Sequence, residues 1–404
     1  MQVTRRRTAI IAMTIGAVLF AAACGSSSKT PASGTTTSPS SSSVSLTPAS
    51  FTADFSAMAQ LKDLASKGKG LIGVLLPDTT SSARYESYDR PYLKQAFEAA
   101  GLSSSDFKID NAQGSATTMQ TQADADITNG ASVLVLDALD SGSGAAIEAS
   151  AKAKGVAVVD YDRLTKGGPA DRTYVSFDNV NVGKFIGNGE VECIKAWNVK
   201  KPNILVMDGD ATDNNAKLFA QGYNSVLKPY FDDKSYVKVG EPAGTWTPAV
   251  TATNFEQQYT AHPNINAVIT PNDDNANAVI AQLQKLNIPA KTFPTTGQDA
   301  SPVGLQNILK GYQCGTVYKP ITAEAQAAVT IALYLRAAEK PPASLLNGTT
   351  KDDQTNTSVA SVLLIPKWVT ADNMEATVIK DKWIKASALC VSAVSSACTA
   401  AGIK

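Results

Sequence analysis

The sequence predicts an α/β protein in which two similar lobes of parallel β-sheet border a ligand cleft. Apolar stretches of strand length alternate with stretches of helical periodicity, an order that produces a parallel sheet covered by helices on both faces. The alternation runs through two successive series, which meet near Ser176. Polar residues follow nearly every predicted strand, where open parallel sheets bind their ligands. With 404 residues and 44% hydrophobic content, the chain can form two such cores.

The first series contains the clearest strand of the chain, the apolar stretch 156–159, which lies between Gly155 and the pair Asp162 and Arg163. A short stretch that is apolar on both faces and bounded by turn signals is typical of a buried parallel strand. The first series predicts strands over 71–76, 107–110, 132–136 and 156–159, and helices over 90–100, 117–129 and 145–154.

A passage at 173–177 and a helix over 182–197 lead into the second series. A long apolar helix over 323–338 and a late strand over 359–365 follow it. The second series predicts strands over 204–207, 237–239, 267–270, 295–296 and 316–318, and helices over 216–230, 250–261, 276–286 and 303–310.

The N-terminus has the features of an export signal. Three arginines at 5–7 precede an apolar run over 8–23 and then Cys24, so residues 1–23 are predicted to be a secretory signal and not a membrane-spanning helix. The small residues before Cys24 resemble the lipobox of bacterial lipoproteins, which implies cleavage before Cys24 and lipidation of its thiol. An ordinary secretory signal cut nearby is the alternative. Because 26–45 is rich in Ser, Thr and Pro, we expect a lipidated cysteine and tether over 24–69.

Four further cysteines predict two disulfides in an oxidising compartment. Cys390 and Cys398 form the natural local pair, which leaves Cys193 with Cys314, although three pairings are formally possible. None of the spacings is typical of a zinc site, so we expect no metal. The 36 basic and 36 acidic residues balance, and nothing in this charge indicates a nucleic-acid partner.

Polar side chains at the strand ends predict a site for a small, uncharged ligand rich in hydroxyls. Asp162 offers acceptors, and Arg163 offers five donors in a planar fork. A structural ion pair is the alternative for these two residues alone. Asp and Asn are common in turns, so it is their recurrence at one sheet edge that favours a site. The recurring residues are Asp78, Asp178, Asn179, Asp208, Asp213–Asn215, Asn272–Asp274, Gln298, Asp299 and Lys319.

Seven short motifs, in order over about 70–382, resemble the periplasmic sugar-binding proteins of ABC importers, of the ribose and xylose type and most of all their D-xylose-binding branch. The resemblance implies a type I periplasmic-binding-protein fold, with two Rossmann-like lobes, a ligand cleft and three hinge crossings. It implies an N-terminal lobe of 70–177 plus about 320–358 and a C-terminal lobe of 178–319 plus about 359–404. The motifs are YDR at 161–163, SFDN at 176–179, DNNAKLF at 213–219, LKPY at 227–230, PND at 271–273, GQDA at 297–300 and TVYKPIT at 316–322.

The resemblance also implies which residues contact the sugar. Carboxylates would accept hydrogen bonds from its hydroxyls, Arg and Lys would donate, Asn would do both, and aromatic rings would cover its C–H faces. The implied residues are Arg84, Tyr85, Asp162, Arg163, Asp213, Asn215, Trp246, Asn272, Asp299 and Lys319. Alternative roles stay open for some of them. These are packing for Trp246, a place at the cleft rim for Tyr85, and helix capping for Asp213 and, more so, for Asp178.

The function implied is capture of a monosaccharide by a monomeric lipoprotein on the outer face of the cell membrane, for delivery to the permease subunits of an ABC importer. No cofactor is implied. The Ser- and Thr-rich loop 78–83 and the pair Asp137-Ala138 depart from the family near the expected sugar. They leave the ligand open among D-xylose, another aldose such as glucose, and a polyol such as xylitol. A sensor that presents its closed form to a membrane signalling partner is a further alternative.

An enzyme is not expected. His262, the only histidine, lies in a loop after a predicted helix and away from the strand ends, so no Ser/His/Asp set can form at the cleft. No GxSxG elbow is present either. A ligand-sensing repressor would carry a helix-turn-helix at the N-terminus, where this chain has its predicted signal and tether.

Overall fold

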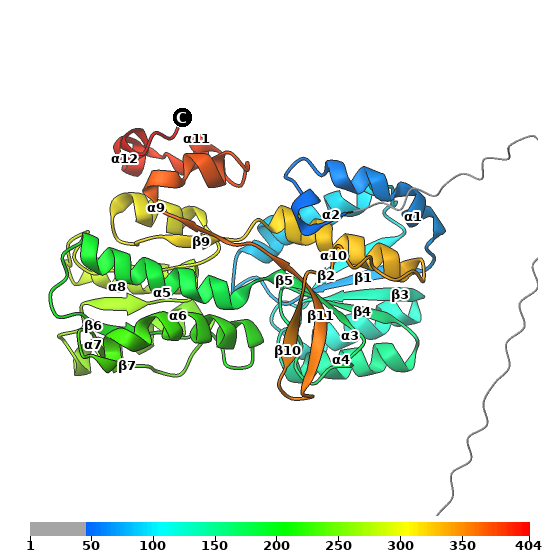
Figure 1. The fold of residues 1–404 in the computed structure, drawn as a ribbon, viewed down its shortest axis with the longest axis horizontal. Coiled ribbons are helices and arrows are strands. Elements are labelled where there is room, and N and C mark those ends of the chain that lie inside the picture. Colours follow the sequence, from blue (N-terminus) through cyan, green and yellow to red (C-terminus); the bar gives the residue numbers. More distant parts are fainter. Residues whose placement is uncertain (1–45) are drawn as a thin grey trace, which may run out of the picture. The chain divides into compact units, whose positions relative to one another are not determined.

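The structure, a computed structural model, describes residues 46–404. Over this range the chain forms a seven-stranded, a three-stranded and a two-stranded sheet with helices around them, which confirms the predicted α/β class (Figure 1). The predicted signal, Cys24 and the first part of the predicted tether lie outside the described residues. Within 46–404 no helix has the length and apolar character needed to span a membrane.

The seven-stranded sheet forms the core of what we call the N-terminal lobe. Its order is β10-β11-β5-β4-β3-β1-β2, and every neighbouring pair is parallel except β10 with β11. The parallel arrangement brings the carboxyl ends of β1, β3, β4 and β5 to one edge. The strands are β1 (Leu71–Leu76), β2 (Phe107–Asn111), β3 (Ala131–Leu136), β4 (Ala157–Tyr161), β5 (Thr173–Phe177), β10 (Gly348–Asp352) and β11 (Thr357–Leu364).

Helices cover both faces of this sheet. Successive strand residues point to opposite faces, so Val74 packs in one apolar cluster with α2 and α10, and Leu75 packs in another with α3 and α4. Burial on both faces is the reason that these strands read as continuous apolar runs. The covering helices are α1 (Lys62–Lys67), α2 (Arg90–Ala99), α3 (Ala116–Thr128), α4 (Ser141–Ala153) and α10 (Ile321–Arg336).

The C-terminal lobe repeats the plan on a smaller scale. Its parallel sheet has the order β7-β6-β8 and continues through single bridges from Val268 to Thr295 and from Gln298 to Val317. Its strands are β6 (Asn203–Val206), β7 (Val237–Gly240) and β8 (Ala267–Ile269), with β9 (Thr316–Tyr318) and β12 (Lys367–Val369) paired antiparallel beside them. Its helices are α5 (Asn179–Ala196), α6 (Asn214–Asp232), α7 (Pro248–Ala261), α8 (Asp273–Lys285) and α9 (Pro302–Lys310).

The chain passes between the two lobes three times. The passages follow Phe177 at the end of β5, Tyr318 at the end of β9 and Leu364 at the end of β11. Each passage leaves a strand of one lobe and enters a helix or strand of the other. Three connections of this kind allow the lobes to move about a hinge.

Two predicted boundaries are wrong. The strand predicted at 359–365 was assigned to the C-terminal lobe, but β11 pairs in parallel with β5 and belongs to the N-terminal sheet. Its edge partner β10 was missed because its sequence, GTTKD, is polar and only partly buried. The tether predicted up to residue 69 ends earlier, since Phe51, Phe55 and Met58 are buried against the N-terminal lobe.

The remaining predicted strands and helices are present with ends shifted by a few residues, except that the strand at 295–296 is reduced to the single bridge at Thr295. After β12 the chain forms short helices that the sequence did not predict, among them α11 (Ala386–Leu389) and α12 (Ser395–Ala400). Figure 1 shows them, in red, beside α9.

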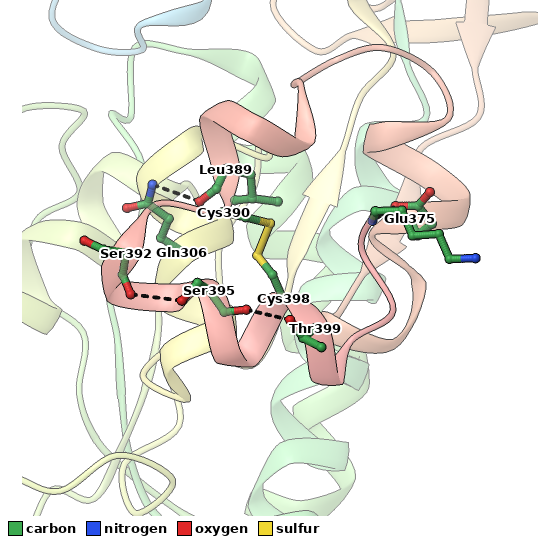
Figure 2. The surroundings of a disulfide bond; sticks show 9 residues. Gln306, Glu375, Leu389, Cys390, Ser392, Ser395, Cys398 and Thr399 are labelled. Atoms are coloured by element: carbon green, nitrogen blue, oxygen red, sulfur yellow. Dashed lines mark hydrogen bonds between the residues drawn. A yellow bond between two sulfur atoms is a disulfide. The ribbon is translucent and has the colours of Figure 1, made fainter.

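Both expected disulfides are present. Cys193 in α5 is bonded to Cys314 before β9, and Cys390 is bonded to Cys398 in the final segment (Figure 2). The first joins two distant parts of the C-terminal lobe, and the second closes a short local loop. They therefore constrain the unfolded chain to different extents.

We expect replacement of Cys193 and Cys314 by Ala to destabilise the protein more than replacement of Cys390 and Cys398. The bonded cysteines are 121 and 8 residues apart. The chain-entropy model then predicts that the free energy of unfolding falls by about 5 kcal/mol without the first disulfide and by about 2.5 kcal/mol without the second. Urea unfolding of the two double variants measures the difference. Equal losses would show that loop closure does not govern the effect.

Candidate ligand-binding site

A cavity of about 290 Å³ lies between the two lobes at the carboxyl ends of their strands. All ten residues implied by the resemblance line it. Four more complete the wall: Gln298, which is one of the strand-end polar residues, and Ser81, Ser82 and Phe219, which the sequence did not single out.

The fold places these side chains by ending elements at the cavity. A loop after β1 and a π-helical turn, Tyr85–Asp89, carry Arg84 and Tyr85 into it. Asp162 and Arg163 follow β4 directly. Asp213 and Asn272 are the N-cap residues of α6 and α8, and Lys319 follows β9. The expectation that polar strand ends converge is therefore met.

Arg84 is a buried cation of the site whose side-chain hydrogen bonds all go to carboxylates. It is 3% exposed, and its guanidinium donates to both carboxylate oxygens of Asp89 at 2.9 and 2.6 Å, to Asp162 at 2.9 Å and to Glu324 at 2.7 Å. Four of its five N–H groups are thus used by three carboxylates from three parts of the N-terminal lobe. One N–H on Nη1 remains for the cavity.

Asp162 is held from several directions. Its Oδ1 accepts from Arg84 and lies 3.6 Å from Lys319 Nζ, and its backbone carbonyl accepts from Tyr174, Ser176 and Asn215 at 2.8 to 2.9 Å. Burial works against the carboxylate, but attraction to Arg84 and Lys319 outweighs it and holds the pKa of Asp162 well below its usual range. Asp162 is therefore a permanent anion at neutral pH.

Arg163 joins the two lobes. Its Nη2 donates to the hydroxyl of Tyr85 at 2.9 Å, and its Nε lies 3.4 Å from Asp213 in the opposite lobe. Behind it, the carboxylate of Asp137 is fully buried, 3.7 Å from Nε, with no hydrogen-bond partner among the described residues. Burial and the nearby Asp162 raise the pKa of Asp137 well above its usual value.

Trp246 forms an aromatic wall of the cavity. Its ring packs edge-on to Phe219 with centroids 6.5 Å apart, and its Nε1 donates to Asp213 Oδ2 at 3.0 Å. A Cβ atom on Gly209 would lie 2.3 Å from this ring, so only glycine leaves room for it. Asp213 also caps α6, because its Oδ1 accepts from the Asn215 amide, while its side chain lines the cavity.

Asn215 is mainly occupied by the protein. Its Oδ1 accepts from Tyr174 and Asn179, and its Nδ2 donates to the carbonyl of Asp162 at 2.9 Å. Both partners of Oδ1 lie where the chain first crosses between the lobes. Asn215 lines the cavity, but most of its hydrogen-bonding capacity connects the lobes at this crossing.

Asp299 and Gln298 supply the free acceptors. Asp299 Oδ2 accepts from Ser82 across the cleft at 3.1 Å, whereas its Oδ1, 3.5 Å from Lys319 Nζ, is buried without a hydrogen-bond partner in the described part of the chain. Gln298 Oε1 is likewise unpaired. Buried acceptors of this kind cost free energy unless a partner is supplied, and a ligand hydroxyl can supply it.

Two site carboxylates have backbone in the left-handed region. Asp162 has φ of 56° and Asp299 has φ of 92°, and Ala300 follows at 50°. Such values are uncommon for residues other than glycine and concentrate at functional sites. At both positions the chain turns sharply just after a strand or bridge and presents a carboxylate to the cavity.

The aromatic residue Tyr85 is not at the cleft rim. It is 2% exposed, its hydroxyl accepts from Arg163 and donates weakly to Asp162 at 3.4 Å, and its ring lies about equally close to the two guanidinium groups. Asp178, in contrast, caps α5 by accepting from the amide of Asn181, as expected.

The side chains that sequence reasoning missed come mostly from loop 78–83. Ser81 lies within 3.3 Å of Arg163, and its carbonyl accepts from Asn272 of the other lobe at 3.2 Å. Asp78 holds this loop by accepting from the amides of Thr80 and Ser81. The position of the loop, directly after β1, was a signal that could have identified both serines. Among residues 46–404 no cluster of His, Cys, Asp and Glu is arranged to hold a metal ion.

The sequence profile of the periplasmic binding protein domain matches residues 72–340, well over half of the chain. The chain belongs to this family. It is 36% identical over 284 residues to the D-xylose-binding periplasmic protein of Escherichia coli K12, covering 70% of this chain and 82% of that protein. It is 29% identical over 335 residues to the multiple sugar-binding periplasmic receptor ChvE of Rhizobium radiobacter, covering 80% and 92%.

Solved structures agree with this assignment. An ABC transporter solute-binding protein of Clostridium phytofermentans with bound β-D-glucose superposes with a TM-score of 0.70 at 26% identity, covering 79% of this chain and 99% of that chain. A carbohydrate transporter solute-binding protein of Chloroflexus aurantiacus, in complex with D-glucose, gives 0.69 at 25% identity, covering 79% and 98%. The type I periplasmic-binding-protein fold is thereby confirmed. The family consists of extracytoplasmic substrate-binding proteins, so this chain binds its substrate and is not an enzyme.

Replacement of Arg84 by Met should lower the free energy of unfolding by about 3–5 kcal/mol at pH 7, since it leaves buried carboxylates without their counter-charge. Asp162, whose folded pKa is depressed, stabilises the protein above its unfolded pKa of about 3.9 and loses this contribution as the pH falls further. The difference in the free energy of unfolding between the wild type and Arg84→Met should therefore become smaller below about pH 4.

Urea unfolding at pH 7 and at pH 3.5 tests this expectation. Lys94→Met is the matched control, because Lys94 forms an exposed ion pair with Glu98, and such pairs contribute less than about 1 kcal/mol. If the difference in unfolding free energy between the wild type and Arg84→Met is the same at the two pH values, the role given to Asp162 is contradicted.

Proposed function

We propose that this chain is an extracytoplasmic solute-binding lipoprotein that captures a monosaccharide and delivers it to an ABC importer. The observation that carries the proposal is the cavity itself. It lies between two hinged lobes, and hydrogen-bonding groups from both lobes line it together with the aromatic residues Tyr85, Phe219 and Trp246.

The chemistry of the lining fits a sugar. Each hydroxyl of a pyranose can donate one hydrogen bond and accept others, so it can connect a cation to a carboxylate. Arg84, Arg163 and Lys319 would donate to the sugar oxygens, and Asp162 and Asp299 would accept from its hydroxyls. We assign to Trp246 the coverage of an apolar C–H face.

D-xylose, or an aldose of similar shape, is our first candidate for the ligand. The 36% identity to a protein named for D-xylose binding supports this choice. The bound glucose of the Clostridium phytofermentans protein supports an aldose more generally. Ser81 and Ser82 at the cavity wall would adapt the site to one arrangement of hydroxyls, because a site that bonds each hydroxyl rejects an analogue that leaves a buried group unpaired.

Delivery would depend on closure. A sugar that contacts both lobes favours the closed form by the contacts available only there, and the permease subunits would bind that form. We place the protein on the outer face of the cell membrane, where lipid on Cys24 and a tether would anchor it. We expect it to be a monomer. Two or more acyl chains would make this anchoring stable.

A sugar sensor is the second candidate. The observation that favours it is the 29% identity to a relative named a multiple sugar-binding periplasmic receptor. A sensor would present the same closed form to a membrane signalling partner instead of a permease. A polyol such as xylitol is an alternative ligand for either role, because it offers the same hydroxyl groups without the ring.

A thermal-shift screen tests the proposal. We expect one aldose among xylose, ribose, arabinose, glucose and galactose to raise the melting temperature, because a ligand that binds only the folded state stabilises it by mass action. Xylitol and myo-inositol are included to detect a polyol site. No shift with any of the seven compounds at millimolar concentration would refute the sugar assignment.

The variant Asp299→Asn locates the binding. It keeps the shape of the side chain but removes the charge at the unpaired Oδ1, so we expect affinity for the sugar to fall about 10- to 100-fold. Asp274→Asn is the matched control, because Asp274 lies on the same edge but outside the wall of this cavity. If Asp299→Asn binds the sugar with unchanged affinity, the sugar does not bind at Asp299 and the site assignment is refuted.

The variant Cys24→Ser tests the anchor. Without the thiol we expect no acylation, and the exported protein should move from the membrane fraction to the soluble fraction. Metabolic labelling with a fatty-acid analogue and fractionation of the cells measure both effects. A Cys24→Ser protein that stays labelled and membrane-bound would exclude this cysteine as the anchor.

A further inference from the structure

The C-terminal segment, residues 370–404, follows residues 72–340, which the family profile matches. It nevertheless forms a small folded unit. Met374, Val378, Leu389 and Val394 are buried in the apolar cluster that also contains Leu305 and Ile308 of α9. The segment is therefore packed on the C-terminal lobe and is not a loose tail.

Several bonds fix this segment internally and to the lobe. Figure 2 shows the Cys390–Cys398 disulfide next to the hydrogen bond from Gln306 in α9 to the carbonyl of Leu389, at 3.4 Å. The last residue also returns to the segment, since the amide of Lys404 donates to Glu375 at 3.2 Å. A unit held at both ends can keep a side chain in a fixed place.

The side chain so held is Trp383, which is 5% exposed and contacts both lobes. In the C-terminal lobe its Nε1 donates to the carbonyl of Ala300 at 2.8 Å, and its ring packs edge-on to Tyr318 with centroids 5.4 Å apart. In the N-terminal lobe its ring is stacked on Tyr88, with centroids 3.7 Å apart and planes inclined by 16°.

Each of these contacts adjoins a residue of the cavity. Ala300 follows Asp299 in the left-handed turn, Tyr318 precedes Lys319, and Tyr88 lies one helical turn after Arg84 and Tyr85. Trp383 itself does not line the cavity. It therefore contacts the supports of the site from outside, on both sides of the cleft.

We propose that Trp383 is a positioning residue that favours the closed arrangement of the two lobes and so raises affinity for the sugar. The stack on Tyr88 joins parts of the chain that separate when the lobes move apart, whereas the bond to Ala300 stays within one lobe. Closing the cleft thus gains an aromatic contact in addition to those made by the ligand. The C-terminal segment acts as a clasp beside the cavity.

This inference rests on the proposed function, because it assumes that a sugar closes the cleft. An aromatic pair of this kind should strengthen sugar binding about two- to tenfold. A purely structural role for Trp383 would instead change the stability of the C-terminal segment without any coupling to Tyr88.

A double-mutant cycle separates these roles. Affinities for D-xylose and D-glucose are measured by titration calorimetry for the wild type, Tyr88→Ala, Trp383→Ala and the double variant. We expect each single variant to bind about two- to tenfold more weakly and the double variant to be little weaker than either. Trp383→Phe, which can still stack on Tyr88 but cannot donate to Ala300, should be intermediate. Trp197→Phe, remote from the cleft, should bind as the wild type does.

The inference would be overturned if the losses of sugar-binding free energy in the two single variants added up in the double variant, or if Trp383→Ala bound with unchanged affinity. Either result would leave the sugar assignment intact. The proposed function fails only if none of the seven screened compounds binds the wild type, and in that case X-ray scattering of the ligand-free proteins tests the clasp without a sugar. A larger radius of gyration in Tyr88→Ala and Trp383→Ala than in the wild type would support it. An unchanged radius in both would refute it.

Discussion

The cleft depends on how one buried guanidinium is neutralised. Arg84 bonds carboxylates from the π-helical turn, from the loop after β4 and from α10, so three segments far apart in the sequence are fixed around one cation. A buried charge that loses its partners is strongly destabilising. Because Asp162 also lies close to Lys319, which follows β9 of the other lobe, the same electrostatic network continues through the crossing between the lobes.

Carboxylates outnumber cations around this network. Burial, together with the nearby negative charge of Asp162, raises the pKa of Glu324 to about 8, although Arg84 lies 2.7 Å away. Asp137 is shifted in the same direction. Both shifts reflect the same surplus of buried negative charge. An uncharged ligand leaves this balance unchanged, whereas an acidic one would disturb it, and this favours a sugar over a sugar acid or phosphate.

Sequence reasoning reached the site where local rules apply and failed where distant contacts decide. Asp162 and Arg163 followed from the strand-end rule, because a parallel sheet brings such residues to one edge. Arg84 lies eight residues beyond β1, on a π-helical turn that no periodicity indicated, and only the family resemblance pointed to it. The partly exposed strand β10 and the stack of Trp383 on Tyr88 were missed because their stability comes from tertiary partners, not from their own sequence pattern.

The C-terminal segment changes how closure is controlled. In a hinged binding protein the ligand supplies the differential contacts that stabilise the closed form. Here the lobes also touch through Ser82 with Asp299 and through Tyr88 with Trp383, so part of that stabilisation belongs to the protein. Such contacts lower the free energy that a sugar must provide, and they raise the population of the closed form for every ligand alike. Discrimination among sugars is thus left to the unpaired acceptors of the cavity wall, Asp299 Oδ1 and Gln298 Oε1.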